Sequence, residues 1–293
     1  MTYKKFIQIL LKELMIFFKN TGVKRTKKKR IRAFIKKSLV SKRQKFILAV
    51  IFLSSGLFVA DHVLGKSGVS IVFALSFLTI LFLYYALKQD LRENFNPQIF
   101  ILPFFYSLSV GLFYFLVPAR FITRVGMTTL YAIGLYSLFL SQNIFTVSSI
   151  RTIQLLSGAR TVSLLITLLS YGFLSSVVFS LHINIFVTLI LIFIYTFLII
   201  LQSIWTHTLD VSPLSQIFWV VSLSLCLSEI SLFLWFSTSS PIVAALFLSA
   251  MFYVLIGLTY AWFEKRLFRS VILEYFWITC ISFIFLVVFS SLI

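Results

Sequence analysis

The chain has 293 residues, of which 60% are apolar and 12% charged, and its mean hydropathy is +1.04. Charged residues make up about a quarter of an ordinary soluble domain, so this composition excludes one and indicates a polytopic membrane protein. The net charge is +18, and sixteen of the 26 Lys and Arg residues lie in the first 45 positions. The chain therefore divides into a basic head, residues 1–45, and an apolar body, residues 46–293.

The basic head contains two patterns. Between residues 3 and 18, apolar side chains recur at steps of three and four, which predicts an amphipathic helix that lies in the membrane interface. A polybasic segment comes next, with Lys27, Lys28, Lys29, Arg30 and Arg32 at its centre. Such clusters attract anionic lipid headgroups by about 1 kcal/mol for each basic residue near the surface. Nucleic acid is the other acidic partner that this charge permits, but no nucleic-acid-binding fold is recognisable here, which favours lipid.

The body contains nine apolar runs, each long enough to cross the hydrocarbon core as a helix of about 20 residues. The runs cover residues 46–64, 69–87, 98–118, 125–143, 161–180, 183–204, 215–237, 241–261 and 270–292. A membrane β-barrel would instead show segments of alternating polarity. We therefore predict an all-α polytopic transmembrane bundle of about nine spans, with eight as the alternative count.

The loops between the runs carry an asymmetric charge. With nine crossings, seven of the ten basic residues of the body fall on the same side as the basic head, and three fall on the other side. Basic residues near span ends are enriched on the cytoplasmic side of a membrane. The pattern predicts a multi-pass protein of the cell membrane with a cytoplasmic N-terminus.

The segment between the fourth and fifth runs, residues 142–160, is amphipathic. Its apolar residues recur at near-helical spacing, and its polar positions include Asn143, Arg151, Gln154 and Arg160. An Arg guanidinium presents a fork of donors that suits a phosphate. These four residues are a candidate site for an anion or a lipid headgroup at the cytoplasmic face. The alternative is that the two arginines are ordinary loop residues of the positive-inside pattern.

Part of this segment resembles a known family. Asn143-Ile144-Phe145, Arg151-Thr152-Ile153, and Leu155-Leu156 with Ala159-Arg160 are similar to a stretch in an uncharacterised family of bacterial multi-spanning membrane proteins. The resemblance covers roughly residues 124–200. It implies a helical membrane fold and a bacterial membrane, and because the family has no established activity it transfers no catalytic residue.

One carboxyl group lies near the middle of an apolar run. Glu229 is within about 5 Å of the centre of the seventh run, and Cys226 and Ser222 share its helix face. Ionisable groups inside a membrane are costly and commonly functional. Glu229 can line a cavity as a coupling or substrate site, or it can be a protonated carboxyl that hydrogen-bonds to a neighbouring helix.

The sequence supports three functions. The first is a transporter-like bundle that handles small solutes, ions or lipids, with Glu229 facing a cavity. The alternative is a non-catalytic scaffold or assembly partner that works through its basic head, with a protein partner or a homo-oligomer left open. The third, a membrane-embedded enzyme acting on a lipid-linked substrate, needs converging polar residues of which the sequence has few. No nucleotide-binding, metal-binding or nucleophile motif is present, so we expect no metal and no cofactor, and a non-enzymatic function is favoured.

Overall fold

The computed structural model describes residues 42–64, 68–88, 91, 96–118, 120–148, 155–209, 216–237 and 239–291. The chain separates into two compact units, Met1–Lys45 and Phe46–Ile293. The predicted interfacial helix and the polybasic centre around Lys27–Arg32 lie outside the described residues. Apart from residues 42–45, the described residues all belong to the second unit.

The described residues form nine α-helices and one four-residue 3-10 helix. They are α3 (Lys42–Leu64), α4 (Gly68–Leu87), η3 (Pro97–Phe100), α5 (Ile101–Leu116), α6 (Phe121–Ser148), α7 (Leu156–Ser180), α8 (Ile185–Thr208), α9 (Ile217–Phe236), α10 (Pro241–Phe263) and α11 (Arg269–Ser291). Each of the nine predicted apolar runs coincides with one of these α-helices, the third run also including η3. The prediction of an all-helical body is confirmed.

Eight of these helices are long and apolar enough to cross a membrane, counting η3 and α5 as one segment. The ninth helix, α3, begins with Lys42, Arg43 and Lys45 and becomes apolar from Phe46 onward. The described chain is thus a multi-pass membrane bundle with at least eight membrane-length helices.

Local sequence signals set several helix ends. Pro97 and Pro241 occupy the first turns of η3 and α10, where the missing backbone donor costs nothing. Asn184 caps α8, because its side-chain oxygen accepts a hydrogen bond from the backbone N–H of Phe186 at 3.1 Å. At the other end of α8, Leu209 adopts a left-handed conformation with φ of 55° and stops the helix. Short loops result from these sharp ends, and consecutive helices run antiparallel.

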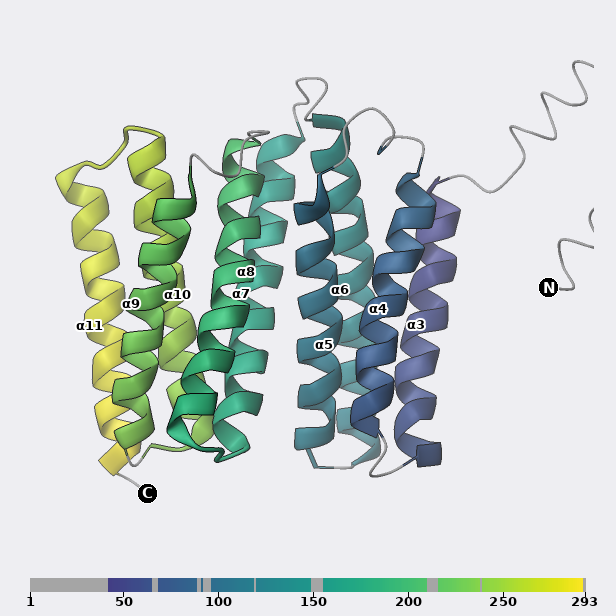
Figure 1. Cartoon of the computed structure of the whole chain (residues 1–293), viewed down its shortest axis with the longest axis horizontal. Coiled ribbons are helices and arrows are strands. Elements are labelled where there is room, and N and C mark those ends of the chain that lie inside the picture. The colour runs from purple at the N-terminus through teal and green to yellow at the C-terminus, as the bar shows by residue number, and fades with distance from the viewer. Residues whose placement is uncertain are drawn as a thin grey trace, which may run out of the picture. The chain divides into compact units, whose positions relative to one another are not determined.

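Helix α7 lies at the centre of the packing. It contacts α5, α6, α8 and α10, whereas α11 packs mainly against α10, and α9 packs mainly against α8. At the opposite edge, α3 contacts α4 through Phe52 and Phe82 and contacts α6 through Phe46 and Phe139. Figure 1 shows this order, with α9, α10 and α11 at one side of the bundle and α3 and α4 at the other.

Buried and half-buried tyrosines join the inner helices by hydrogen bonds. The Tyr131 hydroxyl on α6 lies 2.7 Å from that of Ser107 on α5, and the Tyr195 hydroxyl on α8 lies 2.8 Å from that of Ser175 on α7. Tyr260 on α10 donates to the backbone oxygen of Ser203 on α8 at 2.8 Å. In a bilayer, apolar contact alone gives little drive for helix association, so such bonds help to hold the bundle together.

The alternating helices give the bundle two ends, named here after one residue at each. The Arg160 end carries the start of α7 and the 264–269 turn with its three basic residues; the Arg120 end carries the starts of α6 and α8. Basic residues of the described body are more numerous at the Arg160 end, which also holds Lys88. The charge asymmetry of the sequence is therefore an asymmetry between the two ends of the folded bundle.

Candidate functional site

Glu229 lies on the outside of the bundle. The structure places Ser222, Cys226 and Glu229 on one face of α9, as their spacing predicts, with Ser222 and Glu229 exposed and Cys226 half-buried. Within the described residues, Glu229 makes no hydrogen bond and no ion pair. In the described residues the carboxyl thus has no bonding partner on another helix, and its role as an intramembrane polar site stays a prediction.

The packing of α9 explains this outcome. The helix buries one stripe, formed by Val220, Leu223, Ser224, Leu227, Ser231 and Leu234. Glu229 is two residues after Leu227, which is about 200° around the helix, so it points away from the buried stripe. Serines occur on both faces of α9, and for this reason polarity did not reveal which face is inside.

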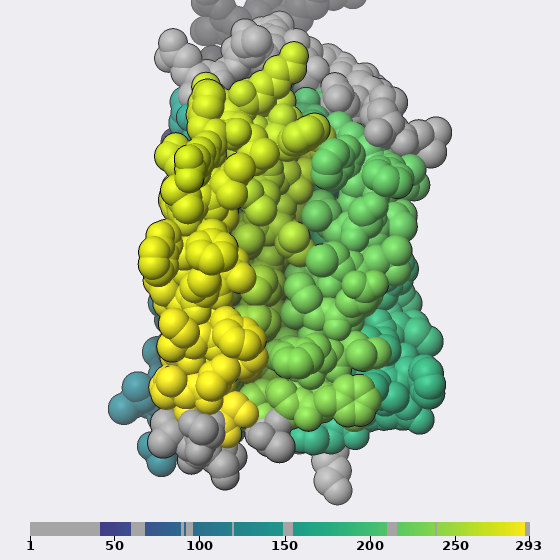
Figure 2. Space-filling view, turned by 90° about the vertical axis from the view of Figure 1, so that its left-hand side faces the viewer, coloured from purple at the N-terminus to yellow at the C-terminus, as the bar shows by residue number. Residues whose placement is uncertain are grey.

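The exposed face of α9 is otherwise apolar. Phe218, Leu225, Phe233 and Phe236 are exposed on it, with Glu229 between them in the sequence. Figure 2 views the bundle from the side of α9 and α11, which both lie on the surface there. We call Ser222, Cys226 and Glu229 the polar stripe of α9. A carboxyl at this position can donate or accept hydrogen bonds toward a group outside the chain.

Arg160 caps the C-terminal end of α8. Its guanidinium donates from Nε to the backbone oxygen of Thr206 at 3.3 Å and from Nη2 to the backbone oxygen of His207. These carbonyls belong to the last turn of α8, where cations stabilise the free ends of backbone dipoles. Two of the donors of Arg160 are thus used inside the chain. A role of Arg160 in an anion site stays a prediction.

The same end of α8 carries a cluster that the sequence did not reveal. The His207 ring stacks on Tyr260 with centroids 4.2 Å apart, and its Nε2 lies 3.5 Å from Oε1 of Glu264. Arg266 reaches the other carboxyl oxygen of Glu264 at 3.4 Å. His207 is far in the sequence from Tyr260, Glu264 and Arg266, and only the docking of α10 on α8 brings it to them. The cluster ties the ends of α7, α8 and α10.

The rest of the predicted anion site is only partly described. Asn143 is half-buried, and its Oδ1 has no hydrogen-bond partner in the described part of the chain. Arg151 and Gln154 lie outside the described residues, so the site of four residues stays a prediction.

Two buried glutamines are the most notable polar groups that sequence analysis did not single out. Gln142 on α6 and Gln202 on α8 are fully buried, and both polar atoms of each side-chain amide lack a partner in the described structure. The rings of Phe145 and Trp205, three residues further along the same helices, are in contact at 6.5 Å. Because α6 and α8 run in the same direction, the two glutamines lie at a similar depth. The indole nitrogen of Trp205 also lacks a partner there.

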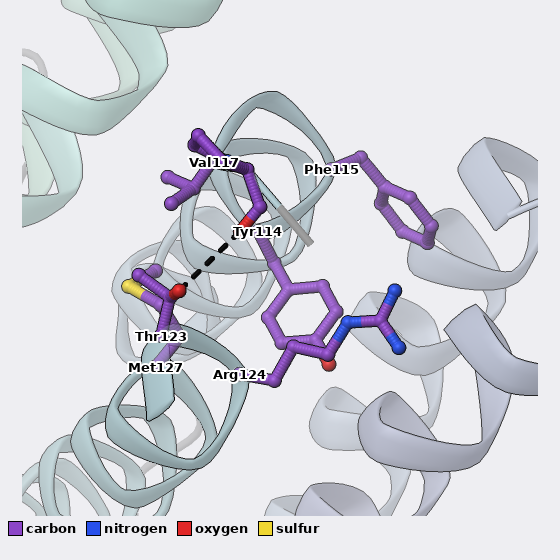
Figure 3. A pocket seen from close by; sticks show the side chains of 7 residues that line it. Tyr114, Phe115, Val117, Thr123, Arg124 and Met127 are labelled. Carbon is purple, nitrogen blue, oxygen red and sulfur yellow. Dashed lines mark hydrogen bonds between the residues drawn. The ribbon is translucent and has the colours of Figure 1, made fainter. Parts of the chain in front are cut away.

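Neither Glu229 nor these glutamines line the following hollows of the described surface. Figure 3 shows one at the Arg120 end, lined by residues of α5 and α6, with the Arg124 guanidinium extended toward Phe115 and the Thr123 hydroxyl bonded to the backbone oxygen of Pro118 at 3.3 Å. Its volume of about 60 Å³ suits only a few water molecules. Larger open grooves, of about 450 and 470 Å³, lie on the outside of the bundle. Of these hollows, the larger ones, which have room for a ligand, lie on the outer surface of the bundle.

The sequence match now adds family membership. A family model described as "Protein of unknown function (DUF5656)" matches residues 56–289, which is most of the chain. The chain belongs to this family. The DUF5656 match confirms the prediction of an uncharacterised family and extends well beyond residues 124–200. No curated protein matches the chain, and no solved structure matches it.

Proposed function

We propose that this DUF5656 protein is a non-catalytic assembly subunit, and that it associates with a second copy of itself inside the membrane through the polar stripe of α9. The observation that carries the proposal is Glu229, an exposed carboxyl near the middle of a membrane-length helix. The interaction surface is therefore on the transmembrane body, whereas the sequence had pointed to the basic head. A role for the head in recruiting a partner stays a prediction.

A lone carboxyl in hydrocarbon is unfavourable whether it is ionised or neutral, since an unpaired polar group costs several kcal/mol. The cost is removed when another chain supplies a partner at the same depth. A neutral carboxyl is its own complement, because each group has one donor and one acceptor. Two copies related by a twofold axis place identical groups opposite each other, so Glu229 can pair with Glu229 of the second copy.

The neighbours of Glu229 suit a close helix pair. Ser222 and Cys226 are small side chains four residues apart, which is the spacing that lets membrane helices approach closely. Phe218 and Phe236 lie toward the two ends of α9, are strongly exposed, and offer packing area on either side. The face thus combines a polar centre with an apolar border.

The orientation that we propose is based on charge. Lys88, Lys265, Arg266 and Arg269 belong to the Arg160 end, and basic residues favour the cytoplasmic side. With α3 counted as a span, nine crossings put the N-terminus in the cytoplasm and the C-terminus on the other side.

A native cysteine allows a direct test. Cys226 lies one turn from Glu229 on the same stripe, and Cys280 lies on α11, so Cys280→Ser leaves a single thiol at the proposed interface. Oxidation of intact membranes with a hydrophobic oxidant should give a disulfide-linked dimer of this variant. Cys226→Ser, with Cys280 as the single thiol, is the matched control and should remain monomeric.

Two substitutions at Glu229 complete the test in the Cys280→Ser background. Glu229→Gln keeps a donor and an acceptor and should retain the cross-link, whereas Glu229→Leu should lose most of it. A cross-link to a different protein, or no cross-link at all, would overturn the proposal. Equal cross-linking in the Leu variant would show that Glu229 does not hold the pair together.

A second candidate function, handling of a small neutral solute, is carried by Gln142 and Gln202. Unpartnered buried amides are costly, and a polar molecule passing between α6 and α8 would satisfy them. Osmotic swelling of proteoliposomes in urea or glycerol measures such passage. Gln142→Met with Gln202→Met should abolish it while the protein stays folded; no solute-dependent swelling by the unmodified protein would exclude the idea.

A further inference from the structure

A groove lies at the Arg160 end of α10. It is lined by Trp262, Phe263, Lys265 and Leu267 and has a volume of about 470 Å³. Trp219 of α9 borders it, with its ring 6.3 Å from that of Trp262 and 5.8 Å from that of Phe263. Tryptophans prefer the boundary between hydrocarbon and water. Since α10 ends at Phe263, the groove lies where the apolar part of the bundle gives way to the loop.

The mouth of the groove is basic. Lys265 lines the groove, and Arg266 and Arg269 are exposed one and four residues further along the chain, with Glu264 as the one acidic residue of the turn. Glu264 is already engaged by His207 and Arg266. Lys265 and Arg269 make no ion pair within the described residues. Two cationic side chains are thus left to face a ligand from outside.

The backbone at Lys265 is unusual for a lysine. Its φ is 55°. The turn is closed by two backbone hydrogen bonds: the Lys265 N–H donates to the backbone oxygen of Trp262 at 3.0 Å, and the Arg266 N–H donates to that of Ala261 at 2.8 Å. This left-handed position after a helix is normally glycine, because a side chain there costs about 1 kcal/mol. The turn holds a cationic side chain at the groove where glycine would be more stable.

We infer that this groove binds an anionic phospholipid, with one acyl chain along Trp262 and Leu267 and the phosphate held by Lys265 and Arg269. A phospholipid matches both parts of the site, because its acyl chain suits the apolar walls and its phosphate suits the cationic mouth. A free inorganic anion would leave the apolar walls unused, and a zwitterionic lipid would bring its own cation to the basic mouth. Basic pockets beside membrane helices are a known type of lipid headgroup site.

The test uses the full chain in nanodiscs of phosphatidylcholine that contain a minor fraction of phosphatidylglycerol with brominated acyl chains. Bromine quenches nearby indoles, so binding in the groove should quench tryptophan fluorescence more than brominated phosphatidylcholine does at the same mole fraction. Trp262→Phe should remove most of this excess. Lys265→Gly should weaken phosphatidylglycerol binding about fivefold, and Lys265→Gly with Arg269→Gln about 25-fold.

Lys265→Gly separates binding from folding, because glycine suits the left-handed backbone and the variant should be at least as stable as the parent. Lys88→Gln is the matched control and should leave the quenching unchanged, because Lys88 is an exposed cation of the same end that directly follows α4. Three results would overturn the inference: equal quenching by the two brominated lipids, an equal loss in Lys88→Gln, or displacement of the lipid by inorganic phosphate at constant ionic strength.

Discussion

Helices α7 and α11 have nearly the same length and hydropathy but opposite surroundings. In the most apolar stretch of α7, 61% of the residues are buried inside the chain, against 28% for α9 and 6% for α11. Polar side chains of α7, such as Ser175, bond to neighbouring helices, whereas Glu229 on α9 and Glu274 on α11 are exposed. Apolar character therefore does not distinguish the inside of this bundle from its outside.

The difference in burial separates two roles of helices within the transmembrane body. The inner helices hold the fold through close packing and tyrosine hydrogen bonds, and substitutions there should act on stability. The outer helices meet lipid or another chain, and substitutions there should act on association while the fold persists. Glu229 belongs to the second class and is a residue that a purely lipid-facing surface would not carry near the middle of a helix.

The largest effect on stability should come from an inner aromatic residue. Tyr171 is fully buried, stacks on Phe252 with centroids 4.4 Å apart and bonds to Thr196 at 3.2 Å. Tyr171→Ala should lower the free energy of unfolding by about 3 kcal/mol, because it leaves a cavity and removes a buried hydrogen bond. Phe276→Ala on α11, where the ring is exposed, should change it by less than about 0.5 kcal/mol. Unfolding in mixed micelles measures both, and similar losses would contradict the contrast.

Substituting alanine at two glycines of α6 should change stability by smaller amounts, and the two changes should have opposite signs. A Cβ at Gly134 would collide with the hydroxyl of Tyr106, which donates to the backbone oxygen of Leu130 at 2.8 Å. Gly134→Ala should therefore destabilise the protein by about 1–3 kcal/mol. At Gly126 nothing lies within 4 Å of such a Cβ, so Gly126→Ala should stabilise the helix by about 0.5–1 kcal/mol. The same unfolding assay decides, and a stabilised Gly134→Ala would show that α5 and α6 are not so closely packed.

A third comparison concerns two arginines of the same end. Arg160 bonds to the last carbonyls of α8, so Arg160→Gln should cost about 1–2 kcal/mol. Arg266 is exposed and makes one ion pair with Glu264, so Arg266→Gln should cost less than about 0.5 kcal/mol. Hydrogen exchange at the last turn of α8 should rise only in the Arg160 variant. Equal hydrogen exchange at this turn in the two variants would show that Arg160 does not cap α8.

The sequence predicted the helices well because membrane-length apolar runs have few alternative structures in a bilayer. It left open which face of α9 is buried, since apolar residues lie on all sides of the helix and its serines occur on both faces. Gln202 lies in an Ile-rich run, and only the contact between Phe145 and Trp205 relates it to Gln142. His207 and Glu264 are 57 residues apart in sequence, and no local pattern links them. Local sequence patterns predict where helices begin and end. Which side chains meet in a site depends on how each helix is rotated about its axis when it packs.

The most direct test of the assembly proposal is the association equilibrium of the intact chain in bilayers at increasing dilution, counted as photobleaching steps of single fluorescent molecules. We predict dimers that dissociate on dilution for the unmodified protein and Glu229→Gln, and for Glu229→Leu a smaller dimer fraction at the same density. Replacing one hydrogen-bonded pair should weaken association by about 1–2 kcal/mol, which is roughly a five- to thirtyfold change. The same dimer fraction in the unmodified protein and in Glu229→Leu would contradict the proposal that this carboxyl holds two copies together.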